Sequence, residues 1–136
     1  MLLMKLQSKE IFSLLQLAHY LARIDNNFGA REEEIISEYC TEMGIENLDS
    51  FDIERFSLHD ILKDFKSEMS KRIVILELMI LIHIDHTFNL NEQNLVKEIS
   101  NSFGIDLDDV NDYSQWGKSV AMLYEVAKIF INEKKI

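Results

Sequence analysis

Apolar residues recur at spacings of three and four along most of this chain. In the segment before residue 24 they would all lie on one face of a helix; they are Ile11, Leu14, Leu15, Ala18, Leu21 and Ala22. Similar stripes run up to Gly44 and again on both sides of residue 85. No stretch alternates with the period of two that is typical of a strand. The pattern therefore predicts amphipathic helices throughout.

Glycine and serine residues indicate where these helices begin and end. Gly44 and Gly104 follow apolar stripes and are predicted to be the left-handed residues just past a helix. Ser57 and Ser67 precede two further stripes and are predicted N-caps. The opening residues are expected to start the first helix, and Ser114 to open the last one after an acidic loop. The predicted fold class is all-α, a single-domain bundle of about six helices.

Two of the expected helices indicate where the core lies. The helix from about residue 67 to 85 is apolar on nearly all sides between Ile73 and Ile82, so we expect it at the centre of the fold. The last helix is expected to present an apolar face made of Trp116, Val120, Leu123, Tyr124, Ala127 and Phe130.

The chain matches itself when it is shifted by 60 residues. Eight of the 25 columns that pair residues 21–45 with 81–105 are identical, whereas average residue usage would give about two. We therefore predict two helical-hairpin repeats about a pseudo-twofold axis. Repeat one covers about 10–66 and repeat two about 67–133, within a single domain over 1–136.

The repeats share the pattern Asp-x-x-Phe-x-x-x-Glu at the turn inside each hairpin. The acidic residues are Asp25 and Glu32 in the first copy, and Asp85 and Glu92 in the second. Each glutamate falls where it can accept a hydrogen bond from the N-cap N–H, and each aspartate where it can organise the turn. This structural interpretation is the favoured one. The alternative is a cation site, because helical phase directs these carboxylates to one interhelical seam and oxygen ligands suit Mg²⁺ or Ca²⁺.

The two turns, "D-x-x-F-G-x-x-E" and "D-x-x-F-N-x-x-E", resemble those of the TerB-like family. This family comprises the tellurite-resistance B proteins and the related domain at the start of membrane-anchored J-domain co-chaperones. The resemblance covers roughly residues 10 to 130, and it differs at Asn26 and His86, where the family typically has glycine. It implies an all-α domain without established catalysis, associated with stress or metal resistance, in which the acidic turn residues have a proposed metal-binding role.

Composition narrows the class of partner. Hydrophobic residues make up 47% and charged residues 28% of the chain, the balance of a soluble globular protein. A net charge of −10 argues against nucleic acid and anionic membranes, which are polyanions, and leaves cations or a protein with a basic surface. No apolar run reaches the roughly 20 residues of a membrane span. With Cys40 as the lone cysteine, no intrachain disulfide can form, so we expect a cytoplasmic protein with Cys40 buried.

Other chemistries have less support. His83, Asp85 and His86 could supply ligands for a transition metal, but structural histidines are the favoured interpretation. An EF-hand loop beginning at Asp25 fails because its sixth and twelfth positions are Ala30 and Ile36. No nucleophile with a neighbouring base and no phosphate-binding loop is visible, so we predict no catalytic residue and no certain cofactor.

The predicted function is a non-enzymatic interaction or sensing module, and divalent-cation binding at the acidic turns is the alternative. The acidic segments could dock a basic partner beside Trp116, although a core role for this tryptophan is favoured. The oligomeric state stays open at this stage.

Overall fold

The computed structural model describes residues 2–24, 29–85 and 88–132, and within these ranges it contains helices and no strand. The elements are a 3-10 turn η1 (Leu3–Lys5) and the helices α1 (Ser8–Arg23), α2 (Ala30–Met43), α3 (Leu58–Leu62), α4 (Glu68–Ile84), α5 (Leu90–Phe103) and α6 (Leu107–Asn132). The all-α class with about six helices is confirmed.

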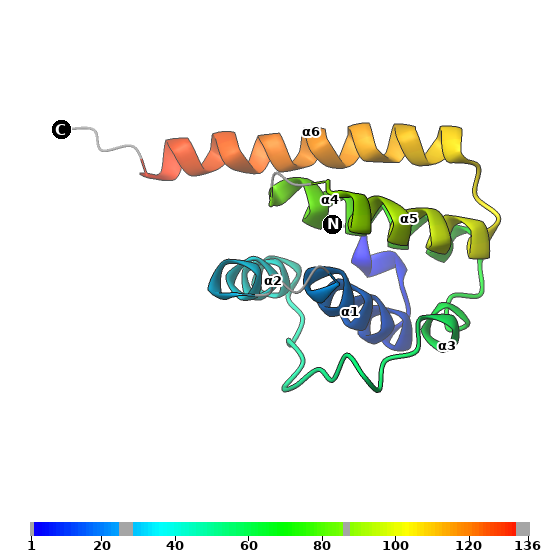
Figure 1. Ribbon diagram of the computed structural model, residues 1–136. Coiled ribbons are helices and arrows are strands. Elements are labelled where there is room, and N and C mark those ends of the chain that lie inside the picture. The colour runs from blue at the N-terminus through cyan, green and yellow to red at the C-terminus, as the bar shows by residue number, and fades with distance from the viewer. Residues whose placement is uncertain (1, 25–28, 86–87, 133–136) are drawn as a thin grey trace.

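Helix α4 forms the centre of the structure. It packs against α1, α2, α5 and α6, with α6 along one side and α1 to α3 on the other (Figure 1). Val74, Ile75, Leu78 and Met79 have no exposed surface, as expected for a helix that is apolar on nearly all sides. The main apolar cluster draws side chains from η1 and from every helix.

The 60-residue repeat reappears in the bounds of the helices. Helices α1 and α4 begin at Ser8 and Glu68, and the 14-residue helices α2 and α5 begin at Ala30 and Leu90. Gly44 and Gly104 follow α2 and α5 with φ values of 68° and 70°, the left-handed conformation that favours glycine. Both predicted helix ends are confirmed.

The predicted serine caps are also present. The N–H of Asp60 donates to Ser57 Oγ at 3.4 Å, and the N–H of Ser70 donates to Ser67 Oγ at 3.0 Å. The opening residues, in contrast, form the 3-10 turn η1 rather than the start of α1. Helix α1 begins later because Gln7 takes the N-cap position, where its N–H donates to Glu10 Oε1 at 2.9 Å.

The last helix begins earlier than predicted, at Leu107 rather than Ser114. The expected acidic loop is its first two turns. The N–H of Val110 donates to the carbonyl of Asp106 at 3.1 Å, and Asp108 and Asp109 occupy the first turn. Carboxylates are stabilised at that end of a helix by the backbone dipole, so the acidic run favours helix rather than opposing it.

The second half of α6 does not bury the whole apolar face that its sequence offers. Leu123 and Phe130 are 69% and 70% exposed, and Ala127 is exposed as well. The reason is visible in Figure 1, where α6 runs past the end of α4 and keeps neighbours only on the side toward α2.

Candidate functional site

Three of the four predicted acidic site residues line one hollow between the repeats. Glu32 of α2, Asp85 at the end of α4 and Glu92 of α5 border a pocket of about 340 Å³ whose other walls are apolar. The fourth, Asp25, lies outside the described residues. The prediction that acidic residues of both turns face a common seam is thus confirmed for these three.

Both glutamates cap their own helices, as the favoured interpretation predicts. The N–H of Gly29 donates to Glu32 Oε2 at 3.0 Å, and the N–H of Asn89 donates to Glu92 Oε1 at 3.1 Å. In the second copy the reciprocal bond is present too, because the N–H of Glu92 donates to Asn89 Oδ1 at 2.9 Å. One oxygen of each carboxylate therefore already satisfies a helix terminus.

Asp85 pairs with a basic side chain of the other repeat. Arg31 Nε donates to Asp85 Oδ1 at 2.8 Å, and this hydrogen bond raises the pKa of the Arg31 guanidinium. The sequence gave no signal for this pair, because the residue 60 positions after Arg31 is Asn91. Among the residues that the structure describes, no three His, Cys, Asp or Glu side chains are arranged to hold a metal ion.

His83 has structural partners. Its Nε2 lies 2.9 Å from Ser114 Oγ of α6, and its ring packs edge-on against Phe88 at 5.6 Å between centroids. Burial and the nearby Lys118 lower the pKa of His83. These contacts agree with the favoured structural interpretation of this histidine, while His86 lies outside the described residues.

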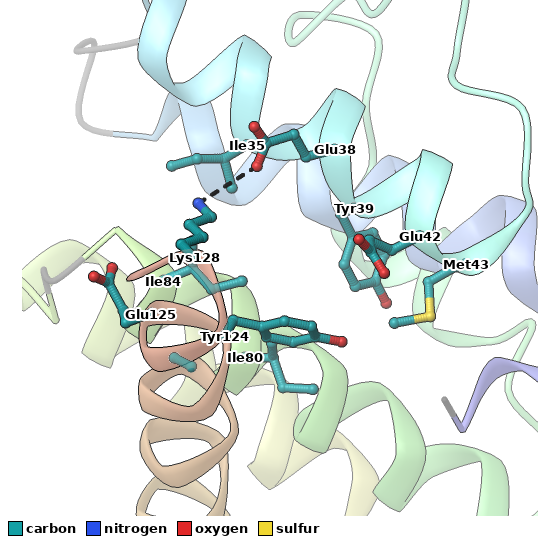
Figure 2. Close-up of a pocket in the computed structure, with 11 residues that line it drawn as sticks. Ile35, Glu38, Tyr39, Glu42, Met43, Ile80, Ile84, Tyr124, Glu125 and Lys128 are labelled. Carbon is teal, nitrogen blue, oxygen red and sulfur yellow. Dashed lines mark ion pairs between the residues drawn. The ribbon is translucent and has the colours of Figure 1, made fainter. Parts of the chain in front are cut away.

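A larger groove, not predicted from the sequence, lies where α2, α4 and α6 meet (Figure 2). We call it the α2–α6 groove; its open space measures about 570 Å³. Its apolar surface is formed by Ile35, Met43, Ile80, Ile84 and Ala121. Tyr124 points from α6 toward Tyr39 and Met43 of α2.

Acidic side chains dominate the rim of this groove. Glu38 and Glu42 of α2 and Glu125 of α6 stand around it, with Lys128 as the basic member. Lys128 Nζ lies 3.6 Å from Glu38 Oε2, so the ammonium group is paired across the rim. Burial together with the charges of Glu42 and Glu77 raises the pKa of Tyr124, as a negative potential in the groove would.

A buried polar pair lies beneath the groove. The Tyr39 hydroxyl donates to Glu77 Oε2 at 2.7 Å, and the N–H of Leu2 donates to Glu77 Oε1 at 3.3 Å. Glu77 has no exposed surface, and burial and this carboxylate strongly raise the pKa of Tyr39. The equivalent positions in the repeat, Ile99 and Leu17, are apolar and fully buried. The repeat architecture therefore does not itself require a polar pair, and this pair is particular to the side that forms the groove.

Sequence reasoning missed this pair, although part of the signal was present. Glu77 interrupts the longest apolar run, and a charged residue in a helix that is buried on all sides needs a partner. The sequence does not say which residue that is, because Tyr39 lies 38 positions away on another helix.

The groove continues beyond its first hollow. A second hollow of about 850 Å³ shares Glu42, Met43 and Tyr124 with it and extends to Met4 beside η1. Met4 is 93% exposed, so the apolar surface reaches well outside the α2–α6 junction. An elongated cavity of this kind fits a chain segment better than a compact small molecule.

Comparisons of this chain with family models, with curated proteins and with solved structures give no match. The TerB-like assignment thus remains a prediction that rests on the two turn motifs. Within 2–24, 29–85 and 88–132, no helix is long and apolar enough to cross a lipid bilayer. Trp116 is half-buried on α6, between the core position expected for it and the exposed anchor of the alternative.

Proposed function

We propose that this protein is a non-enzymatic interaction module whose α2–α6 groove holds a basic, amphipathic helical segment of a partner protein. The observation that carries the proposal is the combination of an apolar floor at Ile80 and Ile84 with an acidic rim at Glu38, Glu42 and Glu125. An amphipathic helix would place its apolar face on the floor, and flanking lysine or arginine side chains would meet the rim.

Two features of the groove support a peptide rather than a small ligand. Its extension toward Met4 offers length, and methionines such as Met43 adapt their shape to varied apolar side chains. The net charge of −10 would attract a basic segment over distance and repel acidic competitors. The resemblance to the TerB-like family adds a physiological setting, a cytoplasmic response to stress or to tellurite and other metals.

The test measures binding of two labelled helical peptides that share a leucine stripe but carry either lysines or glutamates on their flanks. We expect only the lysine peptide to bind, with an affinity that falls as salt screens charges over about 10 Å at 0.1 M. Glu42→Lys should weaken binding, whereas Glu46→Lys, at an exposed position outside the groove lining, should change it much less. Equal weakening by both variants, or equal binding of both peptides, would contradict this assignment.

A second candidate function is the binding of a divalent cation such as Mg²⁺ or Ca²⁺ at the acidic turns. It is favoured by Glu32, Asp85 and Glu92 lining one pocket, with Asp25 in the turn that precedes α2. Each capping glutamate has a second carboxylate oxygen, which is the kind of ligand these cations take.

A further inference from the structure

The outer side of α6 carries an apolar stripe that the fold leaves uncovered. Five side chains of its second half form the stripe and are between 44% and 70% exposed: Met122, Leu123, Val126, Ile129 and Phe130. At about 100° per residue they fall on the side of α6 opposite Gly117, Val120 and Ala121, which are buried against the body. We call these five residues the outer stripe.

The outer stripe is large for an exposed apolar patch. The five side chains expose roughly 600 Å², at the upper end of the largest patch on a typical monomer and near the ~800 Å² that each partner buries in a standard interface. It also lacks charge. Glu125 and Lys128 are the charged residues between Ser119 and Asn132, and both line the α2–α6 groove rather than the stripe.

The spacing of the stripe indicates what covers it. Relative to Val126, the other four residues lie at −4, −3, +3 and +4, so the pattern reads the same in both directions. Two such helices packed antiparallel about a twofold axis through Val126 would set Met122 against Phe130 of the other chain. Leu123 would likewise meet Ile129, and valine, the smallest of the five, would occupy the crossing point, where two helices come closest.

From this symmetry we infer that the outer stripe is the interface of a twofold homodimer, formed by antiparallel α6 helices of two copies of this chain. A partner chosen by charge gains nothing from an uncharged stripe, whereas a second copy matches it residue by residue, with a methionine against an aromatic ring on each side. The α2–α6 groove lies on the other side of the helix, so the dimer leaves it open. The inference is independent of the proposed peptide binding.

Salt separates the two ideas. Each chain carries a net charge of −10, so the bodies of two copies repel each other, and added salt should strengthen the dimer while it weakens a basic peptide in the groove. One measurement can therefore fail without the other.

The experiment is sedimentation velocity on the full chain over a range of concentrations, at low and high salt. We expect a reversible dimer whose dissociation constant rises by more than about tenfold in Val126→Lys, because the twofold axis would place two ammonium groups together. The matched control is Ile131→Lys, which changes a 79% exposed residue of the same helix outside the stripe and should leave the dimer intact. Circular dichroism of each variant checks folding, and Leu123→Lys repeats the test at a second stripe position.

Crosslinking tests the register. In Val126→Cys, two cysteines on the twofold axis should form an intermolecular disulfide on mild oxidation, whereas Ser119→Cys, seven positions away, should not. A wild type that stays monomeric, or a dimer that survives both lysine variants of the stripe, would overturn the inference. So would a monomer that binds neutral lipid vesicles through Val126, since that result would assign the stripe to a membrane surface.

Discussion

Gly117 of α6 lies directly against Met79 of α4. A Cβ atom added at Gly117 would come within 2.6 Å of Met79 Cβ and 2.8 Å of the Met79 carbonyl carbon. Met79 itself is fully buried at the centre of α4. This contact holds the two longest helices close together, and it places the second half of α6 where it forms both the groove and the outer stripe.

Replacing Gly117 with alanine should therefore destabilise the protein. Alanine normally favours a helix by about 1 kcal/mol over glycine, but overpacking costs about 1–3 kcal/mol, and the atoms it would meet belong to a backbone that cannot rotate away. We expect a lower free energy of unfolding in urea. Ser119→Ala, at an exposed position of the same helix, serves as the control and should change it little. A Gly117→Ala protein more stable than the wild type would show that α6 is free to shift.

The pair formed by Tyr39 and Glu77 predicts strong non-additivity. Tyr39→Phe removes the hydroxyl that donates to a fully buried carboxylate, which should cost about 1–3 kcal/mol of unfolding free energy. Glu77→Leu should also destabilise, because it leaves the Tyr39 hydroxyl without this acceptor.

The double variant should be less destabilised than the sum of the two single variants, since the equivalent positions of the repeat are apolar. Urea unfolding of all four proteins measures the coupling. Additive effects would mean that the Tyr39 hydroxyl and the Glu77 carboxylate do not depend on each other for stability.

Local pattern was sufficient for most of the fold. The caps at Ser57 and Ser67 and the glycines that end α2 and α5 were readable, because each depends on a few neighbouring residues. The start of α6 was misread because acidic residues suit a loop and a helix N-terminus equally well. Proximity between distant helices was not readable: the pairs Arg31–Asp85 and Tyr39–Glu77 join residues 54 and 38 positions apart.

The same limit explains the candidate sites. Three acidic turn residues could be placed on one seam because the repeat supplies a symmetry argument. The α2–α6 groove depends on how α6 crosses α2, and nothing within either helix encodes that crossing. The apolar face of α6 was visible in the sequence, but sequence alone could not show that α4 ends before covering it.

His19 should make stability depend on pH. Its Nε2 lies 2.8 Å from Asn47 Oδ1, and Arg23 Nη1 lies 2.9 Å from its Nδ1, a geometry that suits a neutral ring donating through Nε2. Burial lowers the pKa of His19 below its usual 6.5. In this case the unfolded chain binds a proton more readily than the folded one, so stability should fall as pH drops through about 6.5.

Urea unfolding between pH 7.5 and 5 measures this slope. His19→Gln should reduce it, while His59→Gln, which changes an exposed histidine on α3, should not. An unchanged slope in His19→Gln would assign the effect to another group, of which His83 is the first candidate because its pKa is lowered as well.

The last prediction separates the two interpretations of the acidic turns. The structure gives Glu32 and Glu92 capping roles and gives Asp85 a partner in Arg31, so we expect these carboxylates to stabilise the fold without a metal. Asp85→Asn should then lower the melting temperature equally in chelator and in excess Mg²⁺ or Ca²⁺, and Arg31→Gln should lower it similarly. Asp25→Asn applies the same comparison to the first turn. If a cation is the reason for the acids, the wild type must melt several degrees higher when the cation is present, because a ligand that binds only the folded state stabilises it. Removing one of several crowded carboxylates would also relieve repulsion, so both aspartate variants would then be at least as stable as the wild type in chelator. A cation-dependent rise that Asp25→Asn and Asp85→Asn both abolish would overturn the structural interpretation and establish the cation site.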